Sequence, residues 1–291
     1  MMRQGGNRHL IRRPDRRRMA PISGLSINRM IPNMLTLLAL CAGMTAIRVA
    51  TDGSWETAVA AILIAGVLDG LDGRVARLLK STSTFGAQLD SLSDFICFGV
   101  APAFVLYLWT MHSMSSLGWP AALLFGVCSS LRLARFNTQL TVADPPAYAA
   151  KFFTGIPAPA AAGLALMPMV ATFKFGESFF RWPIVSVVLC VAIALMMVSR
   201  VPTFSFKKVR VQHEYVAPLL VVVALMAAFL TTEPWLTLLL VGIVYICLIP
   251  FSVRTYLRDK AAHAAATAAA ATGGIQPVRN LRPVDNEGDK P

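Results

Sequence analysis

Long apolar runs constrain this chain more than any other feature of its sequence. Of its 291 residues, 56% are hydrophobic and only 14% are charged, whereas a soluble domain normally carries about 25% charged residues. Several of the runs reach the roughly 17–25 residues that a helix needs to cross a bilayer. We therefore expect an all-α polytopic membrane protein.

The apolar runs predict about eight transmembrane helices, and an even number puts both termini on one side of the membrane. The spans are expected at 31–50, 55–72, 86–111, 118–136, 156–173, 182–199, 215–231 and 235–253. Of the 27 Lys and Arg residues, all but Arg48, Lys174 and Arg181 would then lie on the side of the termini. Because basic residues concentrate on the cytoplasmic side, we expect an integral inner-membrane protein with both termini in the cytoplasm.

Composition divides the chain into three parts. Residues 1–29 form a basic tail with eight arginines, for which we expect a cytoplasmic position and attraction to anionic membrane lipids. Residues 30–255 would form the transmembrane catalytic domain, and the Ala-rich residues 256–291 a disordered cytoplasmic tail. The net charge of +12 would suggest a nucleic-acid partner in a soluble chain. Here the sidedness of the charges accounts for it, so no nucleic acid is expected.

Four aspartates lie close together between two apolar runs, at Asp69, Asp72, Asp90 and Asp94. On a helix, residues three or four apart share a face, so each pair of aspartates would point one way. The short polar segment 73–85 predicts a tight connection between antiparallel helices, which would bring the two pairs into one cavity. Charged groups within a membrane are costly and mark functional sites. Two shared divalent metal ions would relieve the repulsion and could hold a reacting phosphoryl group, whereas a structural acid cluster would pair with the nearby arginines instead.

The spacing around the aspartates is D-x-x-D-G-x-x-A-R, then eight residues, then G-x-x-x-D-x-x-x-D. The positions are Asp69, Asp72, Gly73, Ala76, Arg77, Gly86, Asp90 and Asp94. This pattern resembles the signature of the CDP-alcohol phosphotransferases, with every position filled. The resemblance implies a helical bundle that binds two Mg²⁺ or Mn²⁺ ions through Asp69, Asp72 and Asp90. It also implies that Asp94 lies at the second metal and acts as general base.

The same resemblance implies how the lipid donor is bound. Gly73, Ala76 and Arg77 would border the nucleotide and its pyrophosphate, and Asn33 and Thr36 would lie near the nucleotide. A homodimer is also implied. The alternative for Asn33 and Thr36 is that they cap the first span.

The acceptor alcohol must be recognised by other segments. The stretches RLARFN at 132–137, KFFTGIPAP at 151–159 and PNMLT at 32–36 are similar to those of bacterial members of the family that use serine as acceptor. The carboxylate of serine calls for a cation, which Arg132, Arg135 or Lys151 could supply, and Asn137 could hold the amino or hydroxyl group. The alternative for each arginine is a cation that extends to the membrane surface.

These observations predict an enzyme that transfers the phosphatidyl group of CDP-diacylglycerol to L-serine, giving phosphatidylserine and CMP. Two alternatives stay open. The acceptor could be glycerol 3-phosphate, inositol phosphate or choline. The chain could also be a metal-ion or proton-coupled transporter, but transport needs polar groups along a path between both faces, and the later spans carry no acids.

Overall fold

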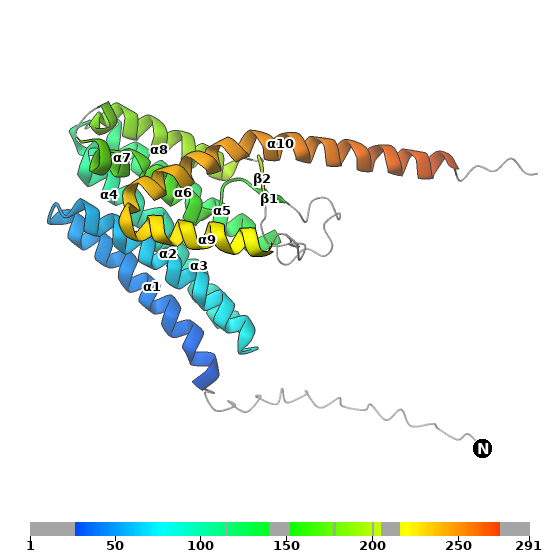
Figure 1. The fold of residues 1–291 in the computed structure, drawn as a ribbon, viewed down its shortest axis with the longest axis horizontal. Coiled ribbons are helices and arrows are strands. Elements are labelled where there is room, and N and C mark those ends of the chain that lie inside the picture. The colour runs from blue at the N-terminus through cyan, green and yellow to red at the C-terminus, as the bar shows by residue number, and fades with distance from the viewer. Residues whose placement is uncertain are drawn as a thin grey trace, which may run out of the picture.

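The computed structural model describes residues 27–114, 116–139, 152–176, 179–199, 201–204 and 216–273. Helices occur in each of the eight ranges where the sequence predicts a span (Figure 1). In the first half of the chain these are α1 (Ile27–Thr51), α2 (Trp55–Leu78), α3 (Thr84–Asp94), the π-helix η1 (Phe95–Val100), α4 (Ala101–Trp109), the 3₁₀-helix η2 (Met111–Ser113) and α5 (Gly118–Gln139). The segments α3, η1 and α4 follow one another without a break and form the third predicted span.

The second half contains a bent pair of helices where one straight span was expected. Its elements are α6 (Ala158–Ala165), α7 (Met167–Phe175), the 3₁₀-helix η4 (Phe179–Arg181), α8 (Pro183–Val198), α9 (Val216–Thr232) and α10 (Pro234–Gly273). The axes of α6 and α7 differ by 40°. Pro168 lies in the first turn of α7, where its missing N–H removes a hydrogen bond that a continuous helix would need.

Among the residues that the structure describes, a short two-stranded ladder is the exception to the helical architecture. Strand β1 (Phe152–Thr154) pairs antiparallel with β2 (Pro202–Phe204), with Phe153 opposite Thr203. The ladder continues at Gly155, whose N–H donates to the carbonyl of Val201 at 2.8 Å. Gly155 has φ +81°, a conformation that glycine adopts without a steric penalty. The ladder ties the segment before α6 to the segment after α8.

The length and composition of the helices identify a membrane protein. Within the described residues, Met30–Thr51, Thr84–Trp109 and Pro234–Arg258 are long and apolar enough to cross a bilayer, and the bent pair α6–α7 would make a fourth span. Helices α8 and α9 are apolar but shorter. Helices α2 and α5 also carry charged residues, among them Asp69 and Asp72 on α2 and Arg132 and Arg135 on α5, which lowers their apolar character.

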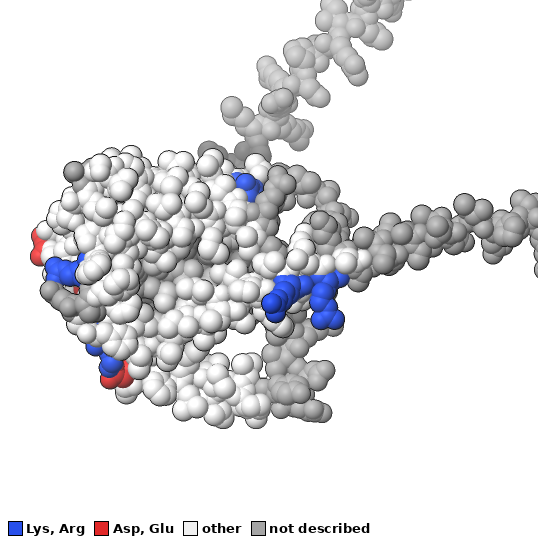
Figure 2. Space-filling model, turned by 90° about the horizontal axis from the view of Figure 1, so that it is seen from above, with Lys and Arg blue, Asp and Glu red and all other residues white. Residues whose placement is uncertain are grey.

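Small side chains let the helices pack closely. Ala46 on α1, Ala58 on α2 and Ala101 on α4 are all fully buried in one core cluster, as expected for helices that approach each other in a membrane. The large apolar side chains of α9 are instead exposed. Figure 2 shows a face that is almost free of charge, with Lys, Arg, Asp and Glu gathered near its two ends.

Helix α10 projects well beyond the rest of the bundle (Figure 1). It continues to Gly273, past the domain boundary expected at residue 255, because alanine has the highest helix propensity. Residues 1–26 and 274–291 lie outside the described residues. The division into two tails and a catalytic domain therefore stays a prediction.

Candidate active site

The two aspartate pairs are joined by a tight turn between α2 and α3. The last turn of α2 ends at Leu78, and Lys80 reverses the chain with φ 49°. Ser83 caps α3, since its hydroxyl accepts a hydrogen bond from the N–H of Gly86 at 3.0 Å. Such a cap satisfies a free donor at the start of the helix. The reversal brings the C-terminal half of α2 alongside α3.

Three of the predicted metal ligands meet at this point. Asp69, Asp72 and Asp90 each offer a carboxylate oxygen, and these three oxygens lie within 4.8 Å of one another. Asp72 is 4% exposed, while Asp69 and Asp90 are half-buried. Asp94 lies next to the group, and its carboxyl group interacts with that of Asp69. The structure therefore brings all four aspartates together, with Asp94 beside a cluster formed by the other three.

The chemistry of this cluster fits a hard divalent cation. Its donors are all carboxylate oxygens, which Mg²⁺ and Mn²⁺ prefer. Negative groups at this separation repel one another strongly away from water. In addition, Asp94 Oδ1 is buried and has no hydrogen-bond partner among the described residues. A buried acceptor of this kind is normally satisfied, and a cation at the cluster would satisfy it.

Helix α1 positions Asp72 through Thr36. The buried hydroxyl of Thr36 lies 2.6 Å from Asp72 Oδ2 and 3.1 Å from the carbonyl of Pro32. A hydroxyl has one proton to donate, and the shorter contact goes to the carboxylate. The expected place of Thr36 is beside the nucleotide, and the structure puts it in contact with a candidate metal ligand.

The neighbouring Asn33 contacts the first turn of α3. A Cβ at position 86 would lie 2.9 Å from Asn33 Oδ1, so Gly86 is what allows α3 to approach α1 this closely. Asn33 is thereby placed next to the aspartate turn. Its predicted contact with the nucleotide stays a prediction.

Helix α1 also holds the helix that carries Asp90 and Asp94. The hydroxyl of Ser93 donates to the carbonyl of Thr36 at 3.2 Å, and Cys97 Sγ donates to the carbonyl of Ala39 at 3.2 Å. Cys97 belongs to the π-helix η1, which begins directly after Asp94. A Cβ at Gly43 would come within 2.7 Å of Cys97 Sγ, so the two backbones are in close contact. Helix α1 thus contacts the helices that carry both pairs of aspartates. The π-helical turn beside Asp94 also fits a functional site, because such turns are frequent there.

The residues predicted to border the nucleotide follow Asp72 directly, within the next turn and a half of α2. No atom lies within 4 Å of the place where a Cβ of Gly73 would be, so its backbone is open to a ligand. Ala76 is half-buried and Arg77 is exposed. Arg77 Nε donates to the carbonyl of Gly73 at 3.0 Å. The three residues thus combine two small side chains with one cation. Their contact with the nucleotide stays a prediction.

The residues predicted to bind the acceptor make different contacts in the structure. Arg132 interacts electrostatically with Asp94, and its guanidinium lies 5.7 Å from the centre of the Phe136 ring. Arg135 Nη1 instead donates to the carbonyl of Val198 at 2.8 Å, at the end of α8. Lys151 lies outside the described residues.

Asn137 is connected to the aspartate helix through a residue that sequence reasoning missed. Its Nδ2 donates to Ser91 Oγ at 3.0 Å, and Ser91 directly follows Asp90. Ser93, which contacts Thr36, was missed as well. Serine is unfavourable inside a helix unless its hydroxyl finds a partner. The two serines between Asp90 and Asp94 could therefore have indicated that this helix makes side-chain hydrogen bonds to its neighbours.

Comparison with known proteins identifies the class to which this fold and site belong. A family model described as CDP-alcohol phosphatidyltransferase matches residues 29–229, and a second, CDP-alcohol phosphatidyltransferase 2, matches residues 214–250. The chain is therefore a member of the CDP-alcohol phosphatidyltransferase family, a family of transferases that generally depend on divalent metals. The family predicted from the aspartate pattern is confirmed.

Within this family, the chain is similar to proteins named CDP-diacylglycerol–serine O-phosphatidyltransferase. It is 40% identical to one from Mycobacterium leprae over 244 residues, which cover 84% of this chain and 81% of the relative. It is 40% identical to one from Mycobacterium tuberculosis over 227 residues, covering 78% and 79%. A Helicobacter pylori relative of the same name is 35% identical over 181 residues, covering 62% and 74%.

Proposed function

We propose that this protein transfers the phosphatidyl group of CDP-diacylglycerol to the hydroxyl of L-serine. The observation that carries the proposal is the meeting of three aspartate oxygens within 4.8 Å, with Asp94 beside them. An all-carboxylate site of this kind suits metal-assisted displacement at phosphorus. The relatives named for the serine reaction support this choice of acceptor.

Asp69, Asp72 and Asp90 would hold two divalent cations, Mg²⁺ or Mn²⁺, with Asp94 at the second. When bound, these ions neutralise the pyrophosphate and stabilise the charge that develops on its oxygens. Exhaustive chelation of the purified protein should stop turnover, and added Mg²⁺ or Mn²⁺ should restore it. Turnover that survives chelation would contradict a metal-dependent site.

The side chains of this chain then account for the steps of the reaction. Asp94 accepts the proton of the serine hydroxyl, as a general base. The serine oxygen forms a bond to the phosphatidyl phosphorus, the bond from phosphorus to the pyrophosphate bridging oxygen breaks, and CMP leaves. Gly73 and Ala76 leave room for the nucleotide beside the cluster, and the guanidinium of Arg77 attracts its phosphates.

Arg132 and Asn137 would position the acceptor. Arg132 is a cation close to Asp94, so a serine carboxylate bound to its guanidinium would bring the hydroxyl near the base. Asn137 reaches α3 through Ser91 and offers its amide oxygen to the serine amino group. Arg135 and Lys151 stay predicted contributors to the same pocket, with a smaller part for Arg135 because its guanidinium already donates to the carbonyl of Val198.

The proposed topology has eight spans, with both termini and the aspartates on the cytoplasmic side of the inner membrane. It is supported by the eight helical ranges and by the concentration of basic residues on one side. There, membrane-bound CDP-diacylglycerol and soluble serine are both within reach. The homodimer implied by the family resemblance also belongs to this proposal, and chemical cross-linking in membranes would test it.

The deciding experiment identifies the lipid product. The purified full-length protein is given CDP-diacylglycerol, metal and equal concentrations of serine, glycerol 3-phosphate, inositol phosphate and choline, and the lipids are analysed by mass spectrometry. We expect phosphatidylserine. A different lipid would change the acceptor, and metal flux into proteoliposomes without any lipid product would favour a transporter.

A further inference from the structure

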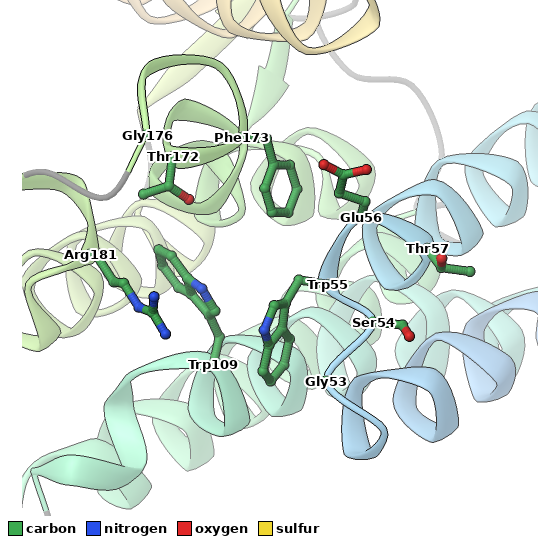
Figure 3. Close-up of a pocket in the computed structure, with 10 residues that line it drawn as sticks. All are labelled: Gly53, Ser54, Trp55, Glu56, Thr57, Trp109, Thr172, Phe173, Gly176 and Arg181. Atoms are coloured by element: carbon green, nitrogen blue, oxygen red, sulfur yellow. The ribbon is translucent and has the colours of Figure 1, made fainter.

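A cavity lies near the ends of several helices at one end of the bundle. Its volume is about 550 Å³. It is formed by residues at the start of α2, at the end of α4, at the end of α7 and in η4 (Figure 3). Two tryptophans, a phenylalanine, a glutamate and an arginine line it, and none of them belongs to the aspartate site.

This cavity is at the opposite end of the bundle from the aspartates. On α2, Trp55 precedes Asp69 by 14 residues, which corresponds to about 21 Å along a helix. On the continuous segment α3–η1–α4, Trp109 is likewise 15 residues from Asp94. The cavity and the candidate active site are therefore separated by most of the thickness of a bilayer's apolar core.

All five tryptophans of the chain are at this end. They lie at the start of α2, the end of α4, the starts of α5 and α10, and immediately before α8: Trp55, Trp109, Trp119, Trp235 and Trp182. Tryptophans concentrate at the level of the lipid head groups. The cavity is thus at the level of the lipid head groups in the leaflet farther from the aspartates.

Three aromatic rings give the cavity its walls. Trp109 is 5% exposed and belongs to the core. Trp55 is half-buried, and Phe173 packs against Trp235 with 4.9 Å between the ring centres. Figure 3 shows the rings of Trp55, Trp109 and Phe173 gathered around one space. Fixed rings in such an arrangement attract organic cations, above all quaternary and primary ammonium groups.

Two opposite charges flank these rings. Figure 3 shows Arg181 beside Trp109, and Glu56 on the other side of the rings, near Phe173. Thr110 Oγ1 donates to the carbonyl of Arg181 at 3.0 Å, which holds the arginine backbone next to the end of α4. A guanidinium has five N–H donors, so it can bind a phosphate while keeping another contact.

We propose that this cavity binds the zwitterionic head group of an amine-bearing phospholipid. The ammonium group would lie against Trp55, Trp109 and Phe173 with Glu56 as its counter-ion, and the phosphate would bind Arg181. The position among the tryptophans favours a lipid over a soluble phosphoamine, because the acyl chains would continue into the bilayer. A head group without an ammonium group would offer no cation of its own to Glu56 or to the rings.

The test measures binding of short-chain lipids to the full-length protein in a non-ionic detergent, by tryptophan fluorescence. Dihexanoyl phosphatidylethanolamine should give a saturable change, and dihexanoyl phosphatidylglycerol should bind at least roughly tenfold more weakly, since it lacks the ammonium group. O-phosphoethanolamine, which carries the head group without the acyl chains, should also bind much more weakly. Equal binding of both lipids, or O-phosphoethanolamine as tight as the amine lipid, would overturn the proposal.

Matched variants locate the binding. Glu56→Gln and Arg181→Gln should each weaken binding of the amine lipid roughly tenfold, because each removes one charge-assisted contact. Asp52→Asn and Arg48→Gln remove the same charges from exposed residues nearby that do not line the cavity, and they should leave binding within about twofold of wild type. An equal loss in the control variants would show that surface charge, not this cavity, attracts the lipid.

Discussion

The two ends of the helical bundle are built by different means. At the aspartate end, side chains make buried hydrogen bonds to a neighbouring helix, such as Thr36 to Asp72 and Ser93 to the backbone of α1. At the tryptophan end, aromatic rings pack against one another and the charged groups are exposed. Buried hydrogen bonds place atoms accurately and are costly to break, whereas exposed charges contribute little. The end that carries out chemistry should therefore be the more sensitive to small changes.

The largest effect is expected for Asp94→Asn. This change keeps the size of the side chain and removes the proton acceptor, so turnover should fall by roughly 10²–10⁴-fold. CDP-diacylglycerol binding, measured by calorimetry, should stay largely intact. Asp52→Asn at the other end is the control and should keep full turnover. Equal loss of binding and turnover in Asp94→Asn would mean that Asp94 serves only as a metal ligand.

A smaller loss is expected for Thr36→Val. Valine has nearly the same shape but cannot donate to Asp72, and loss of such a partner to a metal ligand typically costs 10–100-fold in metal affinity or activity. The concentration of Mn²⁺ that gives half-maximal turnover should rise accordingly, and Thr36→Ser should restore it. Thr110→Val is the matched control, because it removes a threonine hydrogen bond at the tryptophan end. A metal requirement that shifts equally in both variants would refute a specific role for Thr36.

The two arginines of α5 are expected to have different roles, one in serine binding and one in stability. Arg132→Gln should raise the KM for serine roughly tenfold, as expected for loss of a charge-assisted contact, with little change in the KM for CDP-diacylglycerol. Arg135→Gln removes the hydrogen bond to Val198 and should mainly lower stability, by about 1 kcal/mol. Steady-state kinetics and thermal unfolding of both variants give the comparison. If Arg135→Gln raises the KM for serine as much as Arg132→Gln, both arginines bind the acceptor.

The smallest effect is expected at the tryptophan end. Lys174 and Glu233 form an ion pair of 2.5 Å between two partly exposed side chains. Lys174→Gln should change stability by less than about 1 kcal/mol and leave turnover unchanged, as thermal unfolding and product formation would show. A loss of turnover comparable to that of Thr36→Val would contradict the expectation that the aspartate end is the more sensitive of the two.

Helical periodicity and one polar segment were enough to predict the centre of the candidate site. Asp69 and Asp72 lie three residues apart, Asp90 and Asp94 four apart, and the segment between the pairs is too short and polar for anything but a turn. These are local properties of the chain, and the structure agrees with them. The positions of the helices follow from the apolar runs for the same reason.

Contacts between distant segments could not be predicted in the same way. The hydroxyl of Thr36 has its partner 36 residues away, and nothing near it in the chain indicates that partner. Arg132 and Arg135 were expected to act together, but long side chains reach different neighbours, and only packing against α8 decides where Arg135 goes. The ladder of β1 with β2 also depends on segments about 50 residues apart.

The π-helix η1 affects which deletions can be tolerated after Asp94, the last residue of α3. A π-turn holds one residue more than an α-turn, so η1 behaves as a one-residue insertion between Asp94 and α4. Each residue in an α-helix turns the chain by about 100°. Deleting one residue from Phe95–Val100 would convert the π-turn into an α-turn, and Asp90 and Asp94 would keep nearly the same direction relative to α4. A deletion within Ala101–Trp109 has no extra residue to remove, so it would turn the aspartates by about 100° relative to the rest of α4 and should be far more damaging than a deletion in η1.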